Sequence, residues 1–409
     1  MRDQPTSIAR RRTFLLTGYE PIGPEGHHHR FAREIKRFEK TWSLKAEMGP
    51  LEIVEGRPIA RWSATVRGPD WVTETDVRLL RWDDLIAEDG ARSLIARLGL
   101  YGVAALDFVA SGTVWRYILT YWRYTLFAIY PAVLLLAFAI LSTAIGSAGA
   151  ILFGKAAWLL APLVFGALII WPGRRFHLDY MMNDWIFARD MTRSRRPSID
   201  ARAAAMADEI RRGLDDGGVD EVVIIAHSLG AVWMVEAVAR ALRAHPDLAT
   251  RGVPLGLCGV GSSILKIALH PSAQWLRQSV KTVADEPNIL WAEYDSHVDF
   301  VAFYKRNTVE TLEIEAKTKP VSRAIRLSRM LAPETWTRFR GNLLRVHRQY
   351  VMGNEQRYAY DFHLIACGPF PLAAVVFDGD AVADGLGPDG SLRLATTKPS
   401  ATGHETPVL

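Results

Sequence analysis

Cysteine is nearly absent from this chain: its 409 residues include only two, Cys258 and Cys367. Both lie in apolar or glycine-rich surroundings, so we expect them to be buried packing residues. So few cysteines argue against a disulfide framework and favour a reducing compartment. The hydrophobic fraction of 49% and thirteen tryptophans exclude a disordered or fibrous protein, because they are ample for a large core.

A strong excess of one charge is also lacking. The formal net charge is +5, and the arginines lie beside apolar segments rather than in a stripe interleaved with aromatic side chains. This pattern argues against a nucleic-acid partner and favours a membrane surface. The triplet His27, His28 and His29 has no cysteine or carboxylate spacing to support it, and adjacent residues cannot all face one ion. We therefore expect no metal site.

The N-terminus lacks a complete export signal. Arg10, Arg11 and Arg12 precede a short apolar run and so resemble a twin-arginine signal. Such a signal needs an apolar stretch of at least about seven residues, but residues 18–21 (Gly-Tyr-Glu-Pro) interrupt this run after four or five. We expect residues 13–17 to form the first strand of the fold instead.

Long uncharged runs are present at residues 124–154 and 156–173, separated only by Lys155. Each supplies roughly the 20 apolar residues of a membrane-spanning helix, the second by borrowing residues 150–154 while Lys155 snorkels to the interface. They predict a two-helix transmembrane hairpin over residues 115–175 with its tip near residues 146–149. The alternative is a buried helical pair in a large soluble core.

The charges around the hairpin predict its orientation. The expected tip holds no Lys or Arg, whereas eight arginines flank the two runs: Arg116, Arg123, Arg174, Arg175, Arg189, Arg193, Arg195 and Arg196. Tryptophan and tyrosine residues lie near the boundaries. By the positive-inside rule, both flanks, and with them both termini, are expected in the cytoplasm.

Outside the hairpin, short apolar runs alternate with helical patterns. Strands are expected at 59–66, 73–80, 222–225, 255–260 and 288–294, and helices at 30–42, 199–214, 229–244 and 272–284. This alternation predicts an α/β fold with a mostly parallel sheet and flanking helices. The last residues, 378–409, are rich in Gly, Asp, Pro, Ser and Thr and are expected to form a disordered tail.

One stretch carries a chemical motif. The apolar run at 222–225 breaks into Ala226, His227, Ser228, Leu229 and Gly230 and then a helical pattern. This is close to the Gly-x-Ser-x-Gly nucleophile elbow, with alanine in place of the first glycine, and the strand and helix around it supply the required context. Ser228 is the candidate nucleophile. The alternative is an ordinary strand-to-helix turn in which Ser228 only caps the helix.

The order of strand, loop, elbow, acid and histidine resembles the α/β-hydrolase superfamily. Residues 299–303 (Asp-Phe-Val-Ala-Phe) are similar to the Asp-Pro-Val-Ala-Tyr segment of intracellular phospholipase-type hydrolases, with Phe300 in place of proline. His347, followed by Arg-Gln-Tyr, resembles the His-x-x-Tyr segment of the same enzymes. The resemblance implies that Asp299 orients His347, which acts as general base.

Alternatives remain for both residues. Asp295 is the rival acid, and Asp299 could be a solvated loop aspartate. His363 is the rival base, although it lies in an apolar run typical of a packed residue, and His404 lies in the tail. His227 is not expected to be the base, because successive residues at an elbow point apart.

The resemblance also implies an oxyanion site made by two backbone amides. One follows the nucleophile, here Leu229, and one lies in the loop after the early strand, where Tyr19 is our choice. A triad of this kind needs no cofactor.

These observations predict that residues 13–114 and 176–377 form the two parts of an α/β-hydrolase domain, joined through the hairpin. The expected activity is that of a membrane-anchored serine esterase or lipase that cleaves a lipid or amphiphilic ester reached from the bilayer. A noncatalytic scaffold or binding protein is the alternative that the nonstandard Ala226 and Phe300 favour. A thioesterase or acyltransferase could use the same triad.

Overall fold

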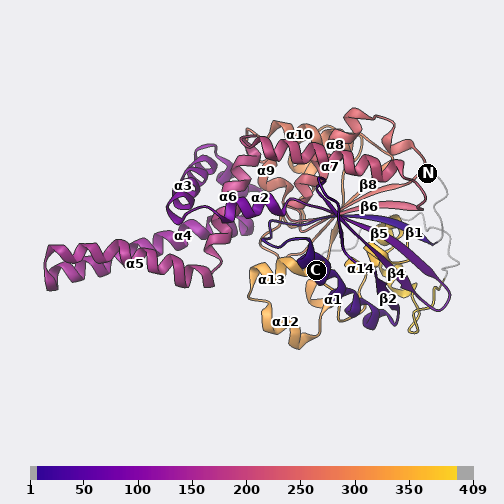
Figure 1. The fold of residues 1–409 in the computed structure, drawn as a ribbon, viewed down its shortest axis with the longest axis horizontal. Coiled ribbons are helices and arrows are strands. Elements are labelled where there is room, and N and C mark those ends of the chain that lie inside the picture. The colour runs from indigo at the N-terminus through magenta and orange to yellow at the C-terminus, as the bar shows by residue number, and fades with distance from the viewer. Residues whose placement is uncertain (1–6, 394–409) are drawn as a thin grey trace.

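A single mixed sheet organises the protein, whose computed structural model describes residues 7–393 (Figure 1). Its strands are β1 (Arg10–Leu16), β2 (Lys45–Met48), β3 (Glu52–Ile53), β4 (Ile59–Arg67), β5 (Val72–Leu80), β6 (Glu221–His227), β7 (Leu255–Val260), β8 (Ile289–Asp295) and β9 (Val321–Ala324). The strand order is β2-β4-β5-β1-β6-β7-β8-β9, with β3 paired to β4. Strands β5, β1 and β6 to β9 run parallel, whereas β4 is antiparallel to its neighbours. The expected mostly parallel sheet is confirmed.

Strands β1 and β6 form a switch point in this topology. From β1 the chain builds the sheet outward on one side, to β5, and later returns to β6 on the other side of β1. Crossover connections leave these two strands in opposite directions, so a crevice opens beyond their carboxyl ends. Ligand sites of open α/β sheets lie at such crevices.

Helices cover both faces of the sheet (Figure 1). The helices of the body are α1 (Pro24–Trp42), α7 (Pro197–Asp215), α8 (Gly230–Ala244), α9 (Ile264–Ala268), α10 (Gln274–Ala284), α11 (Thr308–Thr311), α12 (Pro333–Phe339), α13 (Leu343–Arg348), α14 (Phe362–Cys367), α15 (Leu372–Phe377) and α16 (Gly379–Asp384). Two separate apolar clusters result, one beneath α7, α8 and α10 and one beneath α1 and α14. Both cysteines are buried and unpaired.

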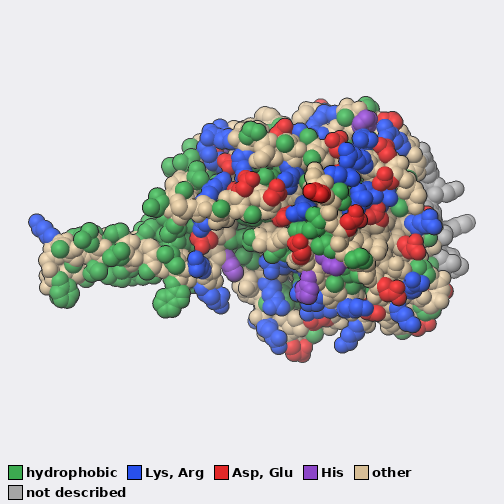
Figure 2. Space-filling model, in the orientation of Figure 1, with side chains coloured by type: hydrophobic (Ala, Val, Ile, Leu, Met, Phe, Trp, Pro, Cys, Tyr) green, Lys and Arg blue, Asp and Glu red, His purple; other side chains and the backbone are tan. Residues whose placement is uncertain are grey.

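A helical hairpin projects from this body (Figure 1). It follows α2 (Asp83–Gly90) and α3 (Leu94–Ala110), is built from α4 (Thr113–Phe153) and α5 (Leu160–Leu168), and leads into α6 (Leu178–Thr192). The segments Thr113–Phe153 and Lys155–Gly173 are long and apolar enough to cross a membrane. The bent pair α2 and α3 would add a third span if it counted as one. Figure 2 shows that the projecting hairpin is covered mainly by hydrophobic side chains.

The predicted tip of the hairpin is wrong. Helix α4 continues through residues 146–149 to Phe153, and the chain reverses at Gly154, whose φ is +88°, and Lys155. A Cβ on Gly146 would lie 2.9 Å from the Cβ of Ala161, and one on Gly149 would lie 3.2 Å from that of Ala157. These glycines therefore allow two helices to pack closely rather than forming the turn. The tip carries Lys155.

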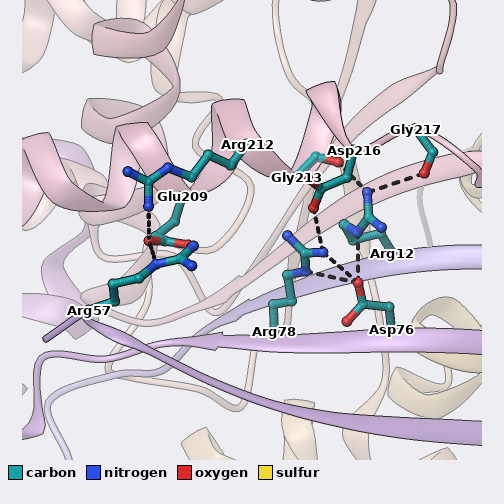
Figure 3. Close-up of polar contacts among 9 residues, drawn as sticks. All are labelled: Arg12, Arg57, Asp76, Arg78, Glu209, Arg212, Gly213, Asp216 and Gly217. Atoms are coloured by element: carbon teal, nitrogen blue, oxygen red, sulfur yellow. Dashed lines mark hydrogen bonds and ion pairs between the residues drawn. The ribbon is translucent and has the colours of Figure 1, made fainter. Parts of the chain in front are cut away.

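The arginines at the N-terminus have structural roles. Strand β1 begins at Arg10, three residues before the predicted start. The buried Arg11 pairs with Glu221 at 2.9 Å, and Arg12 pairs with Asp76 at 2.8 Å. Figure 3 shows Arg12 and Arg78 between strands β1 and β5 and the end of α7. Arg12 and Arg78 hold the sheet to this helix, whereas Arg11 holds β1 to β6 and to the carbonyl of Gly368.

The predicted disordered tail is wrong over residues 378–393. Helix α16 occupies its start, Leu386 is buried and pairs with Leu392, and the Trp71 indole donates a hydrogen bond of 2.9 Å to the Gly390 carbonyl. A few apolar anchors therefore hold a polar segment against the body. Residues 394–409, which include His404, lie outside the described residues.

Candidate active site

Ser228 occupies a sharp turn between β6 and α8. Its φ is +55°, a left-handed conformation that a serine adopts only at a cost, and its side chain is half-buried. A Cβ on Gly230 would lie 2.4 Å from the carbonyl oxygen of Leu16, so this position requires glycine. Ala226, fully buried inside β6, is accommodated. The strand, turn and helix of a nucleophile elbow are all present.

The loop after β1 lies directly against this turn. A Cβ on Gly18 would lie 3.0 Å from the Cβ of Ser228, so only a glycine backbone fits there without a shift. The next residue, Tyr19, buries its ring and donates a hydrogen bond of 2.9 Å from its hydroxyl to Asp89. Within residues 7–393 the backbone N–H groups of Tyr19 and Leu229, the expected oxyanion donors, have no hydrogen-bond acceptor.

His347 and Asp299 form a buried pair. The Nδ1 atom of His347, in α13, lies 2.7 Å from Oδ2 of Asp299, in the loop after β8. Asp299 is fully buried, and its Oδ1 accepts a hydrogen bond of 2.9 Å from the Val301 amide. This second bond fixes the carboxylate. With its Nδ1 hydrogen directed at Asp299, His347 is left with an Nε2 lone pair that has no partner in the described chain.

One cleft brings the predicted residues together. Ser228, His347 and Tyr19 all line a cavity of about 580 Å³. Oγ of Ser228 lies 3.4 Å from Oγ of Ser263, and the hydrogen bonds within residues 7–393 do not include one between Ser228 and His347. Nucleophile-to-base contacts often tighten only when substrate binds, so the missing hydrogen bond does not exclude His347 as the base.

His227 contacts the candidate base, His347. Its Nε2 lies 3.0 Å from the backbone carbonyl of His347 and donates to it, and the two rings lie 4.5 Å apart. Burial, reinforced by the neighbouring His347, lowers the pKa of His227 to about 3. A neutral His227 therefore holds the His347 segment in place.

The rival residues lie elsewhere. Oδ2 of Asp295 accepts a hydrogen bond of 2.8 Å from the Lys305 amide, and burial raises its pKa to about 7. His363 is fully buried among Phe31, Phe38 and Phe362, and neither of its ring nitrogens has a partner in the described chain. Burial lowers the pKa of His363 to about 3, so it is a neutral core residue.

The histidine triplet lies in the first turns of α1. His28 contacts the Gly49 carbonyl at 3.1 Å, and burial lowers the pKa of His27 to about 4. Within residues 7–393, no group of three or more His, Cys, Asp or Glu side chains could hold a metal ion.

Ser263 is a site residue that the sequence reasoning missed. It follows β7 and lies nearly buried beside Ser228, whose carbonyl accepts a hydrogen bond of 3.1 Å from the Ser263 amide. The sequence does contain a signal for this residue, because Gly-Ser-Ser at 261–263 directly follows a predicted strand. The carboxyl ends of neighbouring parallel strands meet at one edge of a sheet, so residues after this strand are expected near Ser228.

Helix α4 contacts the loop that carries Asp299. The Arg123 guanidinium donates a hydrogen bond of 3.2 Å to the His297 carbonyl and lies 5.6 Å from the ring centre of Phe300. The phenylalanine that replaces the expected proline is therefore a contact to the helical hairpin.

The fold and site define an α/β protein in which a serine on a strained strand-to-helix turn and a histidine line one cleft, and the histidine is paired with a buried aspartate. Comparison with protein-family models, curated protein sequences and solved structures finds no match to this chain.

Proposed function

We propose that this protein is a membrane-anchored serine hydrolase with an α/β-hydrolase-type fold that cleaves carboxylic esters of lipids or other amphiphiles. The observation that carries the proposal is the shared cleft, in which Ser228 lies on a left-handed turn and His347 is bonded to the buried Asp299. The order of these residues, and their places after β6, after β8 and beyond β9, agree with that fold.

The proposed chemistry proceeds through an acyl-enzyme. Nε2 of His347 takes the hydroxyl proton of Ser228 while Oγ attacks the ester carbonyl carbon. The amides of Leu229 and Tyr19 stabilise the negative oxygen of the tetrahedral intermediate. The carbon–oxygen bond to the leaving alcohol breaks, and His347 returns the proton to that alcohol. Water activated by His347 then releases the acid. The Asp299 carboxylate orients His347 and stabilises the imidazolium.

Two apolar surfaces support membrane attachment, the projecting hairpin of α4 and α5 and the exposed face of α3. Helix α4 covers 41 residues but is kinked at Tyr121, where the backbone is not helical. The part beyond the kink, residues 122–153, is at about 1.5 Å per residue still longer than a bilayer core is thick. The first part of α4 packs on the body and the rest projects with α5 (Figure 1). Helix α3 adds exposed Ile95, Leu106 and Val109 beside the hairpin. A water-soluble monomer rarely exposes such a continuous apolar area. The catalytic domain and both termini would lie in the cytoplasm.

Some of the arginines that flank the hairpin form contacts within the protein, in addition to contributing positive charge to the proposed cytoplasmic side. Arg116 donates a hydrogen bond of 3.0 Å to the Leu269 carbonyl, and Arg189 and Arg193 pair with Asp107. Arg174 lies 3.9 Å from Asp179 at the base of the second arm, whereas the neighbouring exposed Arg175 has no ion-pair partner among the described residues. The orientation is therefore supported by fewer free charges than the sequence suggests.

The proposal is tested by labelling the detergent-solubilised protein with an uncharged fluorophosphonate, which traps activated serines. Wild type should label, Ser228→Ala should not, and His347→Ala should label far more slowly. Mass spectrometry should place the adduct on Ser228 and not on its neighbour Ser263. Absence of labelling in folded wild type would contradict the proposal and favour a noncatalytic binding protein.

A further inference from the structure

The cleft beside Ser228 carries an excess of positive charge. Among its lining residues are four arginines and two glutamates: Arg33, Arg37, Arg345, Arg348, Glu20 and Glu34. The excess is therefore two positive charges before any histidine is protonated. Figure 2 shows Lys and Arg side chains on this face between the base of the apolar hairpin and the α12–α13 region.

Both glutamates of the cleft already form ion pairs with arginines. Glu34 pairs with Arg33 at 2.7 Å and Arg37 at 3.2 Å and also accepts a hydrogen bond of 3.0 Å from the Gly353 amide. Each carboxylate in the cleft is thus shared by two guanidiniums, because Glu20 likewise pairs with two.

Glu20 holds its ion pairs across a wide pH range. It lies 2.7 Å from Arg30 and 2.9 Å from Arg348. Burial by itself raises the pKa of Glu20, but the two arginines outweigh it and lower the pKa to about 2. Glu20 is therefore ionised and fixes Arg348 at the wall of the cleft.

Arg345 is the arginine of this cleft that has no ion-pair partner among the described residues. Its guanidinium lies 4.4 Å from the ring centre of Phe339, which orients it, and it has no carboxylate partner within the described residues. It stands two residues before His347 on α13 and is exposed. An exposed, oriented guanidinium beside a reacting centre binds carboxylate or phosphate oxygens in a forked geometry.

The position of the cleft indicates where its ligand comes from. His177 and Tyr180, which also line it, lie at the start of α6, within a few residues of the membrane-candidate segment that ends at Gly173. An ester held there would meet apolar helices on one side and arginines on the other.

We propose that the arginines of this cleft, with Arg345 as the principal contact, bind the anionic phosphate head group of a lipid ester whose acyl ester faces Ser228. This inference rests on the proposed hydrolase function for its catalytic meaning, but head-group binding is measured without catalysis. The substrate class is an anionic glycerophospholipid, which phosphatidylglycerol represents, in preference to the zwitterionic phosphatidylcholine.

The test measures equilibrium binding of short-chain radiolabelled lipids to the full-length Ser228→Ala protein in neutral detergent. Phosphatidylglycerol should bind about tenfold or more tightly than phosphatidylcholine, as expected for a charge-assisted contact, and salt should reduce the difference. Arg345→Gln in the same background should abolish the preference. Arg340→Gln removes an exposed arginine of the neighbouring segment that does not line the cleft, so the preference should persist.

Equal binding of the two lipids, or a preference that survives Arg345→Gln, would overturn the inference. Glycerol phosphate and inorganic phosphate form a second arm: tight binding of either would identify a site for a soluble phosphate and also overturn it. Fluorophosphonate labelling of the wild type reports separately on the hydrolase proposal. Labelling without lipid preference would leave that proposal standing, and lipid preference without labelling would identify an anionic-lipid receptor.

Discussion

The ring of Tyr124, in helix α4, stacks on the ring of Phe303 with their centroids 4.0 Å apart and an interplanar angle of 27°. Phe303 lies four residues after Asp299, so a helix that is apolar enough to cross a membrane packs directly against the loop of the candidate acid. The apolar helix and the loop of the proposed catalytic acid are therefore in direct contact.

Tyr124→Ala should therefore slow labelling of Ser228 as well as destabilise the protein. Removing a buried aromatic ring costs about 3–5 kcal/mol in general, and here the cavity opens beneath the Asp299 loop. Tyr124→Phe is the matched control, because the Tyr124 hydroxyl has no partner in the described chain. The labelling rates of the two variants are compared in detergent. Equal rates for alanine and phenylalanine variants that remain folded would refute a link between the packing of α4 and the reactivity of Ser228.

Asp299→Asn should reduce labelling by orders of magnitude while the fold persists. An amide at this position favours the wrong tautomer of His347, and such a change lowers turnover by about 10⁴-fold in a serine protease triad. Asp295→Asn should retain labelling, because Oδ2 of Asp295 accepts only the Lys305 amide. The opposite ranking would make Asp295 the acid.

Gly261→Ala should displace His347. Gly261 has a φ of +55°, and a Cβ there would lie 3.0 Å from Cε1 of His347 and 2.8 Å from the Tyr350 ring. The left-handed backbone alone costs about 1–2 kcal/mol. Gly259→Ala is the matched control two residues earlier, where the nearest atom is 3.5 Å away. Thermal unfolding and labelling should both separate the two variants; a fully reactive Gly261→Ala would contradict the described geometry.

His363→Phe should stabilise the protein more at low pH than at neutral pH. Burial lowers the folded-state pKa of His363 to about 3 from an ordinary value of 6.5, so between these pH values the unfolded state binds a proton that the folded state does not. The stability of wild type therefore falls with decreasing pH by about 1.4 kcal/mol per unit from this residue. Phenylalanine has no such dependence.

Thermal midpoints in detergent at pH 7.5 and pH 5.5 test this prediction. The advantage of the His363→Phe variant should grow by about 1.4 kcal/mol over that interval. A pH-independent difference would show that His363 is protonated in the folded protein or is not buried.

The orientation of the hairpin is testable with single cysteines. Burial raises the pKa of Cys258 and Cys367, the latter to about 12, so the native thiols should not react. Lys155→Cys, at the tip, should react with a membrane-impermeant maleimide in intact cells, whereas Asp208→Cys, exposed on α7, should react only after lysis. Reaction of both in intact cells, or of Asp208→Cys alone, would contradict a cytoplasmic catalytic domain.

Local pattern was sufficient for much of the fold. The predicted strand at 255–260 coincides with β7, because an apolar run ends at a glycine with positive φ. The two-residue β3 and the short helices α12 and α13 escaped prediction, since such segments are too short for any periodicity to show. Residues 146–149 were misread because glycine has two uses, in turns and in close helix packing.

The candidate site likewise contains residues that local sequence predicts and contacts that it does not. Ser228 was predictable because an elbow requires small residues at fixed positions along the chain. The contacts of Glu20 with Arg348 and of Tyr124 with Phe303 were not, because they join segments more than a hundred residues apart. Only the packing of the folded chain brings these side chains together.

The place of the hairpin within the sheet also fixes an order of events during synthesis. Strand β1 pairs with β5, which precedes the hairpin, and with β6, which follows it. A nascent chain therefore exposes an unpaired edge of β1 until the apolar helices have left the ribosome. If those helices are delivered to a bilayer as they emerge, Ser228, His347 and Asp299 can come together only on a chain that is already attached to that bilayer.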